Sequence, residues 1–185
     1  MVGKSIIVDR EKIYMHLDRL KHIPIIDVDH HRIHEGHRFT VVDFDSSVAV
    51  ETPKYWHIKA PNLPLIHFIY SVYSARSGTV QIFRNPTLSN DGTPLNIDNN
   101  NQNNLRTSTL LAFKDPTVTD DGTLIGGQII GSDGDAPNNK GADGGDKERV
   151  NERILKRNSS YIIKFTAVLN NTRVSIRMEH YEQVG

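Results

Sequence analysis

The C-terminal part of the chain alternates apolar and polar residues with a period of two, and this alternation restricts the fold more than any other feature. In residues 161–169 and 174–178 every second residue is apolar, whereas Arg173 and Arg177 fall on the opposite face. A slip of one residue would bury these arginines, so the register is well defined. With Asn170-Asn171-Thr172 as the turn, the pattern predicts a β-hairpin with one buried face. That face comprises Tyr161, Ile163, Phe165, Ala167, Leu169, Val174, Ile176 and Met178.

Shorter stretches with the same period occur from Ile25 onward. The stretch Leu65–Ser74 is apolar on both faces, which is typical of a strand in the middle of a sandwich. At 185 residues, the chain fits one domain with a short appendage. We therefore predict a mainly β fold, an antiparallel, jelly-roll-like β-sandwich that occupies residues 25–185. Further strands are predicted over residues 25–29, 38–44, 54–60, 79–84 and 107–114.

A short N-terminal arm, residues 1–24, precedes this domain. Asp9 can cap a helix that ends at Ile23, because Pro24 follows. The apolar stripe of this predicted helix either packs on its own domain or docks on a neighbouring subunit. An apolar stripe of two turns at a terminus adds little to a hydrophobic core. Docking on a neighbouring subunit is therefore the more specific of the two hypotheses. The candidate partner-docking residues are Ile13, Leu17 and Leu20.

The charge balance argues against several classes of function. Lysine plus arginine and aspartate plus glutamate both number 22, so the formal net charge is zero. Nucleic-acid binders carry a basic excess, and we expect no nucleic-acid partner here. We expect no membrane span either, since no apolar run approaches about 20 residues. A chain without net charge tends to associate, which is typical of a component of an assembly.

No catalytic motif stands out. The chain contains no cysteine, no Gly-x-Ser-x-Gly elbow and no phosphate loop of the Gly-x-x-x-x-Gly-Lys kind. We therefore predict that the protein is not an enzyme and needs no cofactor.

Side chains that could bind a metal or take part in catalysis are concentrated in one histidine-rich segment, residues 27–37. The spacing of His34-Glu35 and His37 is not that of the metalloprotease helix, and we expect an extended conformation here. Metal-binding jelly rolls use paired strand histidines, so a metal-dependent enzyme remains a third hypothesis. We expect histidines that hydrogen-bond locally and no metal site. The weak candidates for metal ligands are His30, His31, His34 and His37.

Two further features concern the loops. The phrase that begins at Asn85-Pro86-Thr87 and contains Asp91-Gly92 recurs from Asp115-Pro116-Thr117, with Asp121-Gly122. Each copy predicts a tight turn in which glycine takes a positive φ. The two turns would be equivalent corners of two pseudo-symmetric up-and-down strand pairs of one sandwich. Calcium binding by the aspartates is the alternative, although the spacing fits no EF-hand loop. The asparagine-rich residues 96–104 and the glycine- and aspartate-rich residues 131–146 are expected to be surface loops.

Taken together, several phrases of the chain resemble a family of tailed-bacteriophage virion proteins, the jelly-roll-like decoration or structural proteins of the head. The resemblance covers about Asp27 to Glu182. Where relatives often have Glu-Trp-Ile-Leu, this chain has Arg153 in place of tryptophan. The phrases are His31-x-x-His34-x-Gly36-x-x-Phe39, Asn90-Asp91-Gly92-Thr93, Asp121-Gly122-Thr123, Gly144-Gly145-Asp146-Lys147-Glu148-Arg149, Glu152-Arg153-Ile154-Leu155-Lys156-Arg157-Asn158-Ser159-Ser160-Tyr161 and Glu179-His180-Tyr181-Glu182.

The resemblance implies a structural protein of the virion, made in the cytoplasm of the host bacterium. It would decorate or stabilise the capsid exterior by binding the major capsid protein and by forming a homo-oligomer. The alternative is a carbohydrate- or receptor-binding module of a tail fibre or tail appendage. In that alternative, aromatic side chains beside polar loops would form the platform for a sugar. The candidates are Tyr55, Trp56, Tyr70 and Tyr73.

Overall fold

The structure is a computed structural model. It describes residues 6–8, 13–15, 25–26, 28–131, 142–145 and 152–183, with side chains from residue 30 to 131 and from 152 to 183.

The described residues of the N-terminal arm form strands. β1 (Ile6–Val8), β2 (Ile13–Met15) and β3 (Ile25–Ile26) make a small antiparallel sheet of their own. The predicted helix over residues 9–23 is therefore not supported, and of its docking stripe Ile13 lies in β2. A short helix is marginal in water, whereas β-branched and aromatic residues such as those of β1 and β2 favour a paired strand. The other two stripe residues, Leu17 and Leu20, lie outside the described residues.

Two antiparallel sheets build the domain. The first, here called the β17 sheet, has the order β10-β4-β17-β6-β14, and β15 also pairs with β6. Its strands are β4 (Arg38–Val48), β6 (Leu65–Ser74), β10 (Asp98–Asn99), β14 (Ala142–Gly145), β15 (Arg153–Ile154) and β17 (Thr172–Gln183).

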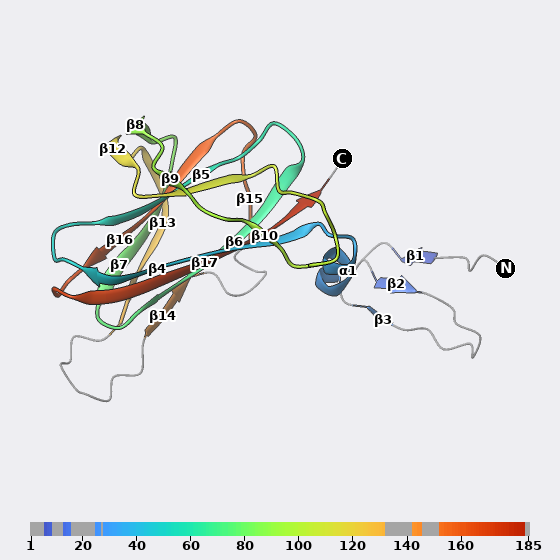
Figure 1. The fold of residues 1–185 in the computed structure, drawn as a ribbon, viewed down its shortest axis with the longest axis horizontal. Coiled ribbons are helices and arrows are strands. Elements are labelled where there is room, and N and C mark those ends of the chain that lie inside the picture. Colours follow the sequence, from blue (N-terminus) through green and yellow to red (C-terminus); the bar gives the residue numbers. More distant parts are fainter. Residues whose placement is uncertain are drawn as a thin grey trace.

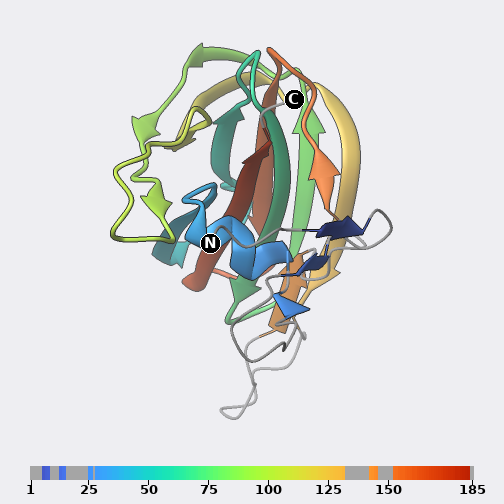
Figure 2. The ribbon, with the colours of Figure 1, turned by 90° about the vertical axis from the view of Figure 1, so that its right-hand side faces the viewer.

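The second sheet, here called the β16 sheet, has the order β13-β7-β16-β5-β11-β9. Its strands are β5 (Lys54–Lys59), β7 (Gly78–Arg84), β9 (Thr93–Pro94), β11 (Leu111–Lys114), β13 (Thr123–Ile130) and β16 (Ser160–Ala167). The two sheets lie along the long axis of the molecule, and their strands curve around a common interior (Figures 1 and 2). The prediction of a mainly β, sandwich-like domain is thus confirmed.

One hydrophobic core fills the space between the sheets. Trp56 and Phe165 come from the β16 sheet, and Phe68 and Ile176 come from the β17 sheet, all with side chains that are fully buried. The alternation of residues 161–167 and 174–178 places its apolar set in this core, as predicted. In β6 every second residue faces this core and is buried. The residues of the opposite face are mostly only partly buried, and Tyr73 is exposed.

The pairing predicted for the C-terminal strands is wrong. β16 pairs with β5 and β7, whereas β17 pairs with β4 and β6, so the chain passes from one sheet to the other through residues 168–171. The two strands face each other across the core and do not form a hairpin. Alternation reports which face of a strand is buried, and that face is the same in a hairpin and in a crossing of this kind.

The two copies of the internal repeat pair with each other. β8 (Thr87–Asn90) and β12 (Thr117–Asp120) form a two-stranded antiparallel ribbon on the outside of the sandwich (Figure 1). Asn85 and Asp115 both have a positive φ, of 57° and 54°, and so do Gly92 and Gly122, at 99° and 84°. Gly92 packs against the backbone of Lys114, and Gly122 packs against the backbone of Arg84. Each tight turn therefore rests on the beginning of the other copy.

The histidine-rich segment folds as a helix. α1 (Val28–His34) precedes β4 at one end of the sandwich, and Gly36 follows with a φ of 71°, as is usual just beyond a helix C-terminus (Figure 1). The extended conformation expected for residues 27–37 is therefore wrong. α1 is far shorter than a bilayer span, and the described part of the chain contains no helix that could cross a membrane.

Candidate functional site

Apolar side chains are exposed on the outer face of the β17 sheet. Val42 is 59% exposed and Phe44 77%, both on β4, and Tyr73 on β6 is 39% exposed. We call these three residues the apolar row. Ser175 of β17 is the register partner of both Phe44 and Tyr73, so the two aromatic residues lie on either side of a small hydroxyl residue. Strands β4 and β6 are about 10 Å apart across β17, which leaves a groove between the two rings.

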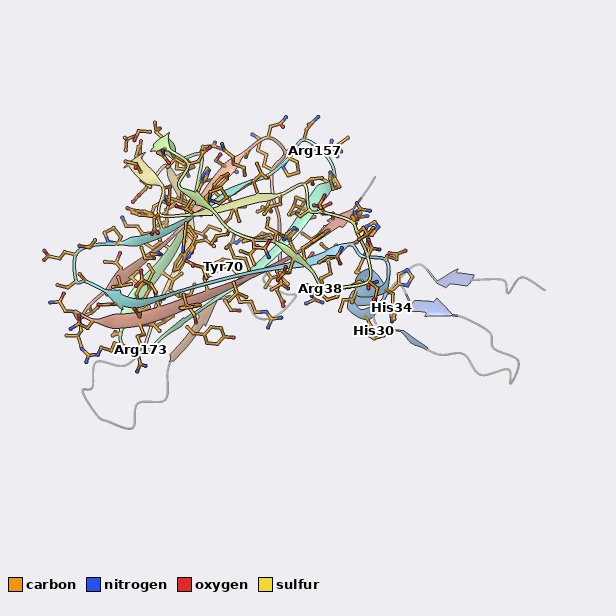
Figure 3. The ribbon with its side chains drawn as sticks, viewed as in Figure 1. His30, His34, Arg38, Tyr70, Arg157 and Arg173 are labelled. Atoms are coloured by element: carbon orange, nitrogen blue, oxygen red, sulfur yellow. The ribbon has the colours of Figure 1, made fainter. Side chains whose placement is uncertain are left out.

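The groove is a shallow hollow of about 400 Å³. Phe44 and Tyr73 line it together with Arg173, Ser175 and Asp45. Arg173 lies at the end of the sandwich that is far from α1 (Figure 3). A hollow with apolar walls and an arginine at its rim can hold an apolar side chain of a partner, because exposed apolar patches of this kind mark interaction surfaces.

Ion pairs border the apolar row along the sheet. Glu179 of β17 accepts hydrogen bonds from Arg38, at 3.0 Å, and from the Nε of Arg177, at 2.8 Å. Further along, Tyr181 donates to Glu152 at 2.8 Å and stacks on His67, and that imidazole bonds to the same carboxylate. The outer face of the β17 sheet thus changes from apolar at one end to charged and hydrogen-bonded at the other.

The ribbon of β8 and β12 is tied to one part of the outer face of the β16 sheet. Asp91 pairs with Lys59 of β5, and Asp121 pairs with Lys164 of β16 at 2.7 Å. The hydrogen bond from Lys59 lowers the pKa of Asp91. His57 is fully buried beneath this ribbon, its Nδ1 faces the backbone oxygen of Asp91 at 3.3 Å, and burial lowers its pKa. The protein's own repeat therefore occupies the part of this face that lies over β5 and β16, whereas Leu124 and Ile129 of β13 remain exposed.

A buried polar cluster lies where residues 106–109 meet β17. Ser108 contacts His180 Nε2 at 2.8 Å and donates to Glu182 at 3.0 Å, and both partners are buried. Glu182 also accepts from the backbone N–H of Thr109 at 2.6 Å. In a serine triad the acid binds the second nitrogen of the histidine, whereas here it binds the serine. The cluster fastens a long connection to the last strand.

The four histidines singled out in the sequence are close in the chain but differ in surroundings. His30 and His34 lie on the exposed face of α1 with 2.9 Å between their Nε2 atoms, and His31 pairs with Glu35 at 3.0 Å. His37 accepts a hydrogen bond from Arg106 at Nε2 and donates one from Nδ1 to the backbone oxygen of Glu182. Within the described residues, no group of three or more histidine, cysteine, aspartate or glutamate side chains has a geometry that would hold a metal.

Of the aromatic residues proposed as a sugar platform, two are part of the core. Trp56 and Tyr70 are buried, and Trp56 donates to Asp43 at 2.8 Å. Tyr55 donates to Asp121 under the ribbon. Only Tyr73 among the four lies in the exposed groove. The expectation of a four-residue platform is therefore wrong, because the side chains of Trp56 and Tyr70 face the core.

The sequence contains a signal for the apolar row. In β4, Phe39 and Val41 are buried. Val42 and Phe44 lie on the opposite face of the strand and are exposed. Apolar residues at positions where a strand should be polar indicate a second contact surface.

We also compared the chain with known proteins: a scan against family models and searches of curated proteins and of solved structures gave no match.

Proposed function

We propose that the protein is a structural protein of a bacteriophage virion that docks on the outside of the capsid and associates with itself. The apolar row carries this proposal. A phenylalanine that is 77% exposed beside an exposed valine costs solubility unless a partner covers it. Its position on the flat outer face of a sheet suits docking against another protein surface, the major capsid protein or a second copy.

The strand order supports the jelly-roll assignment that the resemblance implies. β4, β17, β6 and the short pair of β14 and β15 lie in one sheet, and β5, β16, β7 and β13 lie in the other. Along the chain these strands alternate between the two sheets, as in a jelly roll, except that the fourth and fifth strands, β7 and β13, are neighbours in the β16 sheet. The segment between β7 and β13, which includes the repeat, is an insertion between these two strands. Jelly rolls are a common architecture of viral capsid proteins.

The test compares two apolar-to-polar substitutions at exposed positions. Phe44→Ser removes the centre of the apolar row, and Leu105→Ser is the matched control because Leu105 is 98% exposed and lies outside the row. Sedimentation velocity of the purified protein measures self-association, and co-sedimentation with emptied capsids of the encoding phage measures docking. We expect Phe44→Ser to weaken association at least about tenfold, as for the loss of a buried aromatic anchor. Equal association by both variants and the wild type would overturn the proposal.

A second candidate function uses the same groove. Two aromatic walls with Ser175, Asp45 and Arg173 between and beside them also suit a sugar ring, which stacks on aromatic faces and bonds to polar groups. In that case the protein would be a carbohydrate-binding module of a tail appendage. A glycan array separates the two candidates: binding to a glycan that Phe44→Ser abolishes, without any association between proteins, favours the module.

A further inference from the structure

Two motifs that the proposed function does not use, the histidine-rich segment and the asparagine-rich segment, form one unit at the end of the sandwich. His30 and His34 are one helical turn apart on α1 and both are exposed. Their rings meet edge to face, with centroids 4.6 Å apart, and their Nε2 atoms are 2.9 Å apart. Figure 3 shows the two side chains together on the helix, away from the sheets.

The other histidines whose side chains the structure describes have different partners. His31 pairs with Glu35, and His37 bonds to Arg106 and to the backbone of Glu182. His67 lies between Glu152 and Gln183, and His57 and His180 are buried. The pair on α1 therefore differs from all of these, because its two Nε2 atoms lie 2.9 Å apart where both side chains are open to solvent.

We infer that His30 and His34 bind a divalent transition-metal ion through their two Nε2 atoms. Without a metal, the two imidazoles share one proton in an N–H···N hydrogen bond. A metal ion would instead accept a lone pair from each Nε2 atom. With metal–nitrogen bonds of about 2.05 Å, a separation of 2.9 Å between the nitrogens corresponds to an angle of about 90° at the metal. That angle is the one between neighbouring positions of a square-planar or octahedral ion, which identifies the ligand as an ion of the Cu²⁺ or Ni²⁺ type.

The asparagine-rich segment holds the helix that carries this pair. A helix of seven residues is marginal by itself, and its last carbonyl groups have no partners within the helix. Asn101 donates its side-chain amide to the backbone oxygen of His34 at 3.0 Å, and Asn99 donates to that of Gly36 at 3.0 Å. Asn104 donates to the backbone oxygen of Glu35 at 3.4 Å. These three amides keep the two imidazoles one turn apart and so pre-organise the site.

The site is peripheral to the fold, and water would fill the remaining coordination positions. Neither histidine contributes to the core, which begins at Val41 among the described residues. Removal of metal with a chelator should therefore leave the protein folded and lower its melting temperature only by the amount that the loss of the bound ion implies. This separates the inferred site from a structural zinc site, whose metal contributes directly to folding.

The experiment uses the full chain without a polyhistidine tag and titrates it with Ni²⁺ by isothermal calorimetry. We expect one ion per chain, and His30→Ala or His34→Ala should each weaken binding at least about tenfold, since even the loss of an outer-shell partner costs that much. His31→Ala is the matched control on the same helix and should leave the affinity unchanged. Asn101→Ala should weaken binding several-fold while both histidines remain.

Circular dichroism of each variant checks that the β signal is intact, so that a loss of binding is not a loss of fold. Binding that persists in the double variant His30→Ala, His34→Ala would place the ion elsewhere and overturn the inference. The same holds if His31→Ala weakens binding as much as His30→Ala does. Since none of these variants touches the apolar row, the outcome is independent of the proposed function.

Discussion

Phe44 and Phe165 are the same residue type in opposite surroundings, and this contrast gives a test of the core. Phe165 is fully buried between the sheets, whereas Phe44 is mostly exposed. Phe165→Ala should lower the free energy of unfolding by about 3–5 kcal/mol, because it removes a large buried side chain and leaves a cavity. Phe44→Ala is the control and should cost less than about 0.5 kcal/mol. Urea denaturation measures both, and similar midpoints for the two variants would contradict the assignment of faces.

His180 gives the protein a dependence of stability on pH. Burial lowers the pKa of His180 from an ordinary 6.5 to about 4. Between these values the unfolded chain binds a proton that the folded chain does not bind, so acid favours unfolding. The free energy of unfolding should therefore fall by up to about 3 kcal/mol as the pH falls from about 6.5 to about 4.

Urea denaturation at a series of pH values measures this effect, and His180→Gln is the comparison. The variant should be less stable at neutral pH, because its contact with Ser108 changes, but its stability should depend less on pH. A residual dependence of the same sign should remain, since burial also lowers the pKa of His57. Parallel profiles for the variant and the wild type would show that His180 is not responsible.

At the scale of single residues, the sequence indicated the core well and the surface poorly. The period of two identified Phe165 and Ile176 as core residues, because burial of one strand face is a local property of the pattern. Trp56 was instead offered as part of a sugar platform, although it is buried. Val42 and Phe44 break the polar pattern of their face, but the sequence could not pair Phe44 with Tyr73, which comes from a strand far away in the chain.

At the scale of elements, the repeat makes a prediction about two glycines. Gly92 and Gly122 occupy equivalent turns with a positive φ, and each is in close contact with the backbone at the start of the other copy. Gly92→Ala and Gly122→Ala should each lower the free energy of unfolding by about 1–3 kcal/mol, because a Cβ atom meets backbone and the residue is held at a strained φ. Thermal or urea denaturation measures the change.

Ser89→Ala on the exposed part of the same ribbon is the control for the two glycine variants. It should leave stability within about 0.5 kcal/mol of the wild type. A large effect at only one of the two glycines would contradict the equivalence of the copies.

Elements were easier to find than their partners. Most of the long strands from residue 38 onward were predicted near their observed positions, but β13 was not predicted. β16 and β17 were assigned to one hairpin although they lie in different sheets. The helix α1 was missed because side chains about 65 residues away fix its C-terminal end: Asn101 bonds to the carbonyl of His34, and Asn104 and Asn99 bond to those of Glu35 and Gly36 just after the helix. From the sequence alone, the asparagine-rich segment predicts only a polar loop. The backbone oxygens that accept its hydrogen bonds are distant in the chain and cannot be identified from the sequence.

At the scale of the whole molecule, the core predicts what the N-terminal arm contributes. All members of the core cluster lie between Val41 and Met178. A protein that starts at Ile25 should therefore fold, with the circular dichroism and melting temperature of the full chain. We predict that it no longer associates, if the arm is the second docking element. Sedimentation velocity measures this, and full association by the shortened protein would exclude a docking role for residues 1–24.

The overall class of fold followed from the sequence, whereas the order of its strands did not. Alternation and turn residues are local, but the choice of neighbours for β17 depends on which strands close the core most completely. The candidate docking face is a product of that choice, because it exists only when β4 and β6 flank β17.

The position of β17 also bears on how force or heat would open the sheet. β17 lies between β4 and β6, and it pairs with both along most of its length. In the described part of the sheet β4 and β6 are not neighbours, so β17 alone joins the two halves. A change that frees β17 therefore breaks two ladders of backbone hydrogen bonds at once, and the sheet opens along its middle and not from an edge.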